Sequence, residues 1–255
     1  MLRKFIIDDL KAAFFRFIPL ALTLLAAGVL SAFCIGRLDG EMDVSAAKAV
    51  GFLEAVCALC QKLLLVSAFP AVLLRALDTL TGEGAVFWAG IPARPWKHIV
   101  SKSTAAFLLY LLSAVMYGMV KLVYVRSASD GLYAKSASYS ISSEPSVFLR
   151  STVLAGAIVL FSMLCAQKII LGAAIFCLPV PSRRASTWLV SATAVTVMAG
   201  AYVAGYAAVS RISIFSLSER SADMLTYSYS CAFFGVMSAV LTVADTLLLA
   251  KRAEY

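Results

Sequence analysis

Long runs of apolar residues, separated by short polar segments, dominate the pattern along this chain. Six runs reach the roughly 20 residues that a helix needs to cross about 30 Å of hydrocarbon. They are residues 17–36, 49–74, 103–125, 152–178, 188–209 and 229–250. The alternating pattern of a barrel strand is missing, and only helices or closed barrels satisfy their backbone polar groups in lipid. The sequence therefore predicts an all-α integral membrane protein with six transmembrane helices, which form a single transmembrane domain over residues 1–255.

Ahead of the first run, residues 1–16 carry an amphipathic pattern. Apolar side chains recur there at helical spacing, at Leu2, Phe5, Ile6, Leu10, Ala13 and Phe14. Charged side chains such as Lys4, Asp8 and Lys11 lie elsewhere on the helix, and their mixture does not fit a cleavable signal peptide. A helix of this kind lies in the membrane interface with its apolar face towards the acyl chains. We expect an N-terminal interfacial amphipathic helix, which is also compatible with a basic anchor that sets the topology.

Composition and charge agree with a location in the cell membrane. Hydrophobic residues make up 62% of the chain and charged residues only 14%, whereas a soluble domain has roughly a quarter of its residues charged. Lys and Arg concentrate in cytoplasmic loops, and a cytoplasmic N-terminus puts twelve of them inside and seven outside. Both termini are then cytoplasmic. The net charge of +8 is explained by anionic lipid headgroups, so we expect a lipid bilayer and no nucleic acid as the partner.

The residues that mark catalysis are missing from the sequence. There is no phosphate-binding loop of the G-x-x-x-x-G-K-[ST] type, and His98, the single histidine, is expected to be a loop residue at the membrane surface. The six cysteines all fall within apolar runs, where free cysteine behaves as a small hydrophobe. Cys57 and Cys60 form a C-x-x-C without a second pair. We expect no enzyme activity, no cofactor, no metal site and no disulfide framework.

The segment 75–102 is the longest predicted cytoplasmic connection, and it is rich in glycine, proline and aromatic residues. Val86, Phe87, Trp88, Ile91 and Trp96 would expose more apolar surface than a solvated linker carries. Aromatic side chains on a short segment flanked by turns suit docking into a groove of a partner protein. Anchoring of the same aromatics in the headgroup region is an equal alternative.

Four motifs in the first 102 residues show a resemblance to a known family. They are the opening MLRKFIIDDLKA, the pair Glu83-Gly84, the turn Ile91-Pro92-Ala93, and the pair Ser101-Lys102 directly before a span. This pattern resembles the small six-helix permeases of type-2 ABC exporters of Gram-positive bacteria. In that family an acidic-glycine pair precedes a Leu-Pro-Val turn, and a Ser-Lys pair follows. Here the spacing from Glu83-Gly84 to Pro92 is one residue longer, and Ala89 and Gly90 replace larger residues.

The resemblance implies a permease subunit that works with a separate ATP-binding cassette ATPase. The segment 75–102 would contain a coupling helix that fits a cleft of that ATPase, and residues 1–16 would be an interfacial elbow helix. Together with the aromatic residues above, the expected coupling positions are Glu83, Gly84, Phe87, Trp88, Pro92, Trp96 and Lys97. The family also implies a second permease, in a homodimer or heterodimer, and export of a substrate such as a peptide, an antibiotic or a lipid. ATP hydrolysis would take place on the separate subunit.

Five ionisable residues fall within or near the predicted spans: Glu54, Lys62, Lys121, Lys168 and Asp245. A charge at the centre of the bilayer costs about 2.5–3.5 kcal/mol by insertion scales, so each of them requires a partner or water. A rise of about 1.5 Å per residue places them at depths that predict two pairs, Glu54–Lys121 and Lys168–Asp245. Lys62 falls near the midplane and is the candidate for a water-filled translocation path. Structural pairing of helices, or snorkelling of Lys121 in particular, is the alternative.

Two other functions remain open at this point. A non-transporting multi-pass membrane protein, such as an immunity factor, a sensor partner or a scaffold, would need neither an ATPase nor a pathway. A secondary carrier would use the buried charges for proton coupling. The sequence favours the permease because of the motifs in the segment 75–102.

Overall fold

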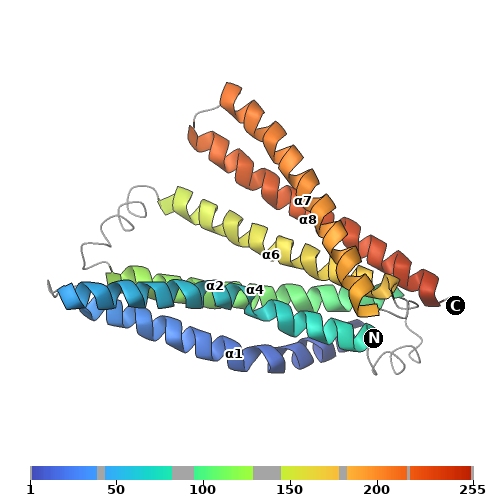
Figure 1. Ribbon diagram of the computed structural model, residues 1–255, viewed down its shortest axis with the longest axis horizontal. Helices are drawn as coiled ribbons and strands as arrows, with labels where there is room; N and C mark the ends of the chain where they lie inside the picture. The colour runs from blue at the N-terminus through green and yellow to red at the C-terminus, as the bar shows by residue number, and fades with distance from the viewer. Residues whose placement is uncertain are drawn as a thin grey trace. The chain divides into compact units, whose positions relative to one another are not determined.

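The computed structural model describes residues 2–38, 44–81, 95–128, 145–177, 183–216 and 219–253. The regular elements in these ranges are all α-helices (Figure 1). They are α1 (Leu2–Leu38), α2 (Val44–Thr81), α4 (Pro95–Ala128), α6 (Pro145–Phe176), α7 (Arg183–Ser216) and α8 (Glu219–Ala253). All six are long and apolar enough to cross a membrane. For the described residues, the prediction of an all-helical protein with six helices that are able to span a membrane is thereby confirmed.

The helices are longer than the apolar runs that predicted them. Only α6 ends before its run does, at Phe176, and even α6 begins earlier than expected. Once a helix is nucleated by the apolar run, each further residue adds a hydrogen bond at little cost, so the helix propagates into the flanking polar sequence. Hydropathy marks the part of each helix that suits the hydrocarbon core, and it does not mark the helix ends.

Helix α1 differs from the expected arrangement of two separate N-terminal elements. It is continuous from Leu2 to Leu38, with no break between the predicted interfacial segment and the first span, and Pro19 lies inside it. Proline has no N–H group and crowds the preceding turn, so α1 lacks the hydrogen bond to the carbonyl of Phe15. Helices bend at such positions. The placement of residues 1–16 in the membrane interface stays a prediction.

The predicted loop 75–102 is partly helical, which corrects its boundaries. Helix α2 continues to Thr81 and α4 begins at Pro95. Proline is well suited to a first helical position because its missing N–H would have no partner there. Residues 82–94, which hold most of the expected coupling positions, lie outside the described residues.

The chain forms two compact units, and α1, α2, α4 and α6 contribute to both of them. The first unit comprises Met1–Leu10, Val72–Phe107 and Ser151–Tyr255. Its apolar core draws on α2, α4, α6 and α8. The core consists of the buried side chains of Ala76, Ile99, Leu171 and Ile175, with Leu77, Leu248 and Leu249 packed against them.

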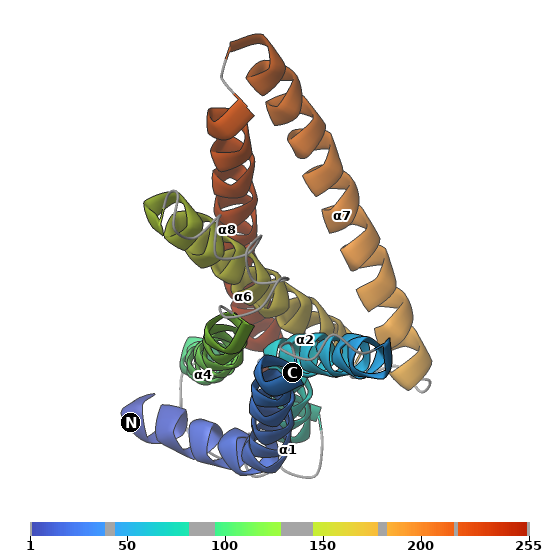
Figure 2. The ribbon, with the colours of Figure 1, turned by 90° about the vertical axis from the view of Figure 1, so that its left-hand side faces the viewer.

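Within the first unit, aromatic side chains join α7 to α8. The two helices contact each other in the halves next to their connection and separate further along (Figure 2). The ring of Tyr202 on α7 stacks on Tyr229 and Phe234 of α8, at centroid distances of 5.9 and 5.2 Å. Its hydroxyl group shares a hydrogen bond of 2.8 Å with Ser230. Gly205 on α7 leaves the space that the Tyr229 hydroxyl occupies.

The second unit comprises Lys11–Ala71 and Leu108–Arg150. Helices α1, α2 and α4 approach closely at Gly28 of α1, which lies against Val120 of α4 and Cys60 of α2. Small residues permit such close packing of helices in a membrane. The hydroxyl of Ser113 on α4 donates hydrogen bonds to the carbonyls of Leu64 and Leu65 on α2. These carbonyls directly precede that of Val66, which lacks its helical hydrogen bond because Pro70 has no N–H to donate.

Candidate functional site

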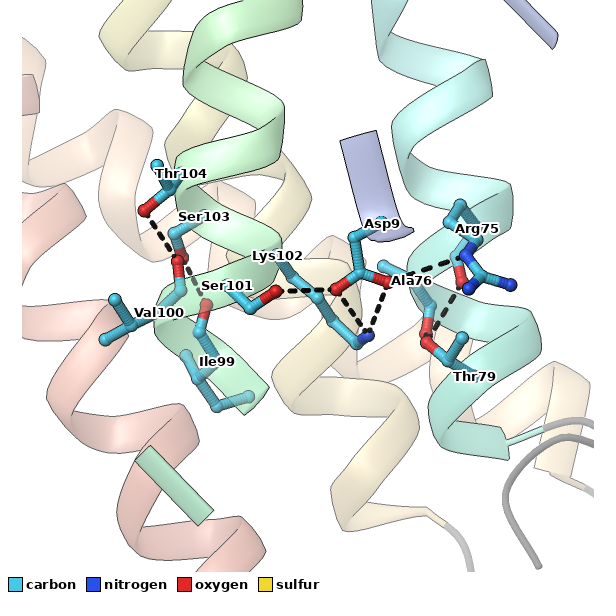
Figure 3. A network of polar contacts seen from close by, with 10 residues as sticks. All are labelled: Asp9, Arg75, Ala76, Thr79, Ile99, Val100, Ser101, Lys102, Ser103 and Thr104. Atoms are coloured by element: carbon cyan, nitrogen blue, oxygen red, sulfur yellow. Dashed lines mark hydrogen bonds and ion pairs between the residues drawn. The ribbon is translucent and has the colours of Figure 1, made fainter. Parts of the chain in front are cut away.

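A buried polar network joins α1, α2 and α4 around the carboxylate of Asp9 (Figure 3). The hydroxyl of Ser101 on α4 donates a hydrogen bond of 2.8 Å to Asp9 Oδ2. The ammonium of the next residue, Lys102, lies 3.4 Å from Oδ2 and 3.5 Å from Oδ1. From α2, Arg75 Nε lies 3.5 Å from Oδ1. One carboxylate therefore holds three helices of the first unit together.

The position of Asp9 in the helix explains why it is buried. Phe5, Asp9 and Ala13 are four residues apart, so they lie on one face of α1, and all three are buried. Asp9 is only 3% exposed. Asp8 precedes it by about 100° around the helix, and its side chain is exposed. The apolar spacing of the N-terminal segment contained this signal, because position 9 falls on the apolar face.

Because Asp9 and Lys102 are both buried, each charge in this network depends on the other for its stabilisation. Lys102 is 4% exposed and Asp9 nearly as little, so neither charge has much access to water. A buried ion pair is costly to desolvate and needs good geometry and additional hydrogen bonds, which Ser101 supplies here. Arg75 is partly exposed and can extend its remaining donors outwards. The network is a structural bond between helices that fails if one charge is removed.

A second contact joins the same parts of α1 and α4. The ring of His98 lies against Phe5, with centroids 5.2 Å apart. The expectation that His98 is a loop residue at the surface is wrong: it lies in the first turn of α4 and is buried. Because α4 begins earlier than the apolar run, the polar residues before the run are helical and turn towards α1.

The network lies at the base of the predicted coupling segment. Arg75 comes shortly before the end of α2, and Ser101 and Lys102 follow shortly after the beginning of α4. The coupling positions Glu83, Gly84, Phe87, Trp88 and Pro92 lie between these helices, outside the described residues. Residues 82–94 are joined covalently to the end of α2 and the start of α4, and Asp9 contacts both of these helices. A force on residues 82–94 therefore acts on these two helix ends.

Two of the expected coupling residues lie in α4, where they belong to its first turn. Trp96 is 41% exposed, so its indole ring is accessible to a partner. The ammonium of Lys97 lies 5.9 Å from the centroid of this ring, within the range of a cation–π contact. These residues are helical, although the sequence placed them in a loop, and their role in coupling stays a prediction.

In the second unit, the structure gives Glu54 a partner that the sequence did not predict. Tyr124 on α4 donates a hydrogen bond of 3.2 Å to Glu54 Oε1 on α2. Lys121 lies one turn before Tyr124 on α4 and is half-buried. The predicted pair Glu54–Lys121 stays a prediction. The side chain of Lys62 is exposed on α2, and its role in a translocation path also stays a prediction.

The structure places Lys168 on α6 and Asp245 on α8 where these two helices meet. The ammonium of Lys168 donates hydrogen bonds to the carbonyl of Ser238, at 3.0 Å, and to the hydroxyl of Thr242. Asp245 follows on the next turn of α8, but its carboxylate forms no ion pair with Lys168 among the contacts of the described residues. The described contacts of Lys168 are thus with neutral groups of α8, and the predicted pair Lys168–Asp245 stays a prediction.

The chemistry available at Asp9 consists of charge pairing and hydrogen bonding. Among the residues that the structure describes, no group of three or more His, Cys, Asp or Glu side chains is placed to hold a metal ion. The arrangement can fix helices relative to one another and can transmit a displacement. Comparison with models of protein families, with curated proteins and with solved structures finds no match to this chain.

Proposed function

We propose that this chain is the transmembrane permease subunit of an ATP-driven exporter, and that a separate ATP-binding cassette ATPase binds the segment between α2 and α4. The observation that supports this most is the buried network at Asp9, which ties α1 to both helices that flank the segment. A connection that merely links two spans has no need of buried charges at its base, because they cost free energy to desolvate.

The network also joins two of the motifs on which the resemblance to type-2 ABC exporters depends. Asp9 belongs to the N-terminal MLRKFIIDDLKA, and Ser101-Lys102 is the pair that precedes the third span. The two motifs are about ninety positions apart in the sequence, yet they share one set of hydrogen bonds. Their contact gives both motifs a common physical role, which is to hold the ends of the coupling segment.

The mechanism follows from this connection. Closure of the ATPase around ATP displaces residues 82–94, and the cytoplasmic ends of α1, α2 and α4 move as one body because Asp9 binds them together. The helices then change between inward-open and outward-open arrangements. As in other two-state switches, the arrangement that the closed ATPase binds more tightly becomes the more populated one. The chain itself carries out no chemistry. It works with a second permease in the cell membrane, with its termini in the cytoplasm, and exports an amphipathic substrate such as a peptide, an antibiotic or a lipid.

Alanine at Phe87 and Trp96 is expected to weaken binding of the ATPase by at least about tenfold, since aromatic anchors contribute most of the binding energy at such interfaces. The matched control is Trp188→Ala. Trp188 is also an exposed tryptophan near a helix start, in α7, and is 69% exposed. The measurement is co-purification of the full-length chain from its native membranes, with the associated ATPase identified and quantified by mass spectrometry.

Three outcomes would contradict the proposal. The first is that no ATPase co-purifies with the wild-type chain. The second is that the ATPase binds the Phe87 and Trp96 variants as well as the wild type, and the third is that single cysteines introduced at 83–97 react with impermeant reagents only from outside the cell. Transport into vesicles without ATP would instead support the secondary carrier.

A further inference from the structure

We propose that Asp245 is a proton-binding site within the membrane-spanning part of the protein. The side chain of Asp245 on α8 lies against Gly172 of α6, within the first unit. It involves no residue of the Asp9 network and does not depend on the presence of an ATPase. The inference therefore stands or fails separately from the proposed transport function.

The surroundings of Asp245 suit a neutral acid better than a carboxylate. The side chain is 2% exposed, and Oδ2 has no hydrogen-bond partner among the described residues. Oδ1 faces the backbone of Gly172 on α6, where a larger residue would collide with it. A carboxylate can only accept hydrogen bonds, and no described residue donates one to Oδ2. An unpaired charge in such a place neutralises by taking up a proton.

Among the residues that the structure describes, the cation that interacts with Asp245 is Lys168, and its hydrogen bonds go to other groups. Lys168 on α6 donates to the carbonyl of Ser238 and to the hydroxyl of Thr242. Thr242 in turn donates its own proton to Ser238, at 2.7 Å, which leaves its oxygen lone pairs to face the ammonium. Two neutral acceptors on α8 therefore solvate Lys168 in place of the carboxylate.

Apart from Lys168, the described groups near Asp245 are uncharged. On the same face of α6, the thiol of Cys165 donates to the carbonyl of Phe234, at 3.3 Å. Leu248 and Leu249, on the next turn of α8, pack against an apolar cluster. Helices α2 and α4 contribute Ala76 and Ile99 to it. Lys168 is thus the charged side chain with which Asp245 interacts.

The protonated form fits the geometry of α8. A carboxylic acid can donate its proton to a carbonyl of the preceding turn, as the hydroxyls of Thr242 and Thr246 do at 2.7 Å. Uptake of one proton forms the Oδ–H bond of Asp245. Release of that proton to water would follow when Lys168 leaves Ser238 and Thr242 and pairs with the carboxylate. The protonation state of Asp245 therefore decides which partners Lys168 binds.

Infrared difference spectroscopy on the full-length protein in lipid nanodiscs tests this site. We expect a carboxylic-acid C=O stretching band at neutral pH that shifts in D₂O and disappears in Asp245→Asn. The band should persist in Asp8→Asn and in Glu54→Gln, which change an exposed acid of α1 and an acid of α2 that already accepts a hydrogen bond from Tyr124. A wild-type spectrum without an acid band, or a band that survives Asp245→Asn, would overturn the proposal.

Thermal unfolding supplies a second readout. Asparagine is the neutral isostere of the protonated acid, so Asp245→Asn should leave the unfolding midpoint at neutral pH unchanged. If Asp245 were instead ionised and compensating Lys168, the same variant would leave a buried cation unbalanced, and the midpoint would fall sharply. A sharp fall that Lys168→Met then reverses would overturn the proposal independently of the spectra.

Discussion

Replacement of Asp9 by asparagine is expected to lower the free energy of unfolding by about 3–5 kcal/mol, the usual cost of removing one partner from a buried ion pair. The amide oxygen can still accept the hydrogen bond from Ser101, so the loss comes from the charge. Lys102 is 4% exposed, and without the carboxylate its ammonium is buried and unbalanced. Arg75 is affected less because it is partly exposed.

The neighbouring residue offers a closely matched control. Asp8→Asn makes the same chemical change one position earlier in α1, on an exposed side chain, and surface substitutions of this kind stay within about 0.5 kcal/mol. The measurement is reversible unfolding of the purified protein in mixed micelles. Equal effects at the two positions would show that the network does not hold the helices together.

A double variant separates the loss of charge balance from other damage. In Asp9→Asn with Lys102→Met, no buried cation remains, so most of the lost stability should return. Lys102→Met alone should cost less than Asp9→Asn, because Asp9 keeps Ser101 and Arg75. The coupling energy of the cycle measures the interaction between Asp9 and Lys102 directly. Additive effects would contradict their pairing.

Replacement of Gly28 by leucine is expected to destabilise the protein by about 3 kcal/mol, at the upper end of the cost of overpacking. A Cβ atom at Gly28 would lie 2.9 and 3.2 Å from the two methyl groups of Val120 and 3.4 Å from Cys60 Cβ. Val120 is fully buried, so its methyl groups have little room to move. Helices α1, α2 and α4 must then separate at Gly28.

Gly118→Leu is the control for this change. Gly118 lies in α4, two residues from Val120, but a Cβ atom there has no neighbour within 4 Å. Because glycine is a poor helix former, leucine at Gly118 should be neutral or stabilise the helix by up to about 1 kcal/mol. Unfolding in mixed micelles again provides the measurement. Similar losses at Gly28 and Gly118 would point to a general intolerance of α1 and α4 and not to close packing.

The motifs that resemble exporter permeases include Asp9 and the pair Ser101-Lys102, and the structure shows that these residues are in contact. The motifs suggested that the segment between the second and third spans binds another protein, but they gave no reason for the Ser101-Lys102 pair or for the acidic residues near the N-terminus. In the structure these residues contact one another. The contact explains why a coupling segment would need them, and it makes Asp9 the position whose replacement is most informative.

The sequence by itself determined the fold class and the number of spans. A bilayer imposes a local condition, since any segment that crosses it must be apolar over about 20 consecutive residues and must satisfy its own backbone. Each of the six runs meets that condition without reference to the rest of the chain, so hydropathy alone was sufficient. The same condition says nothing about the polar residues at the ends of the runs. For that reason hydropathy could not predict that α4 begins at Pro95 and not at residue 103.

Only the tertiary structure decided which polar residues meet. Asp8 and Asp9 are chemically identical neighbours, and the contact of α1 with α2 and α4 buries one and leaves the other exposed. Lys168 was expected to pair with Asp245, but the rotation of α8 presents Ser238 and Thr242 to it. The partner of a side chain depends on the rotation and the depth of two helices relative to each other. This rotation and this depth are set by packing along the whole length of both helices, so they cannot be predicted from any local stretch of sequence.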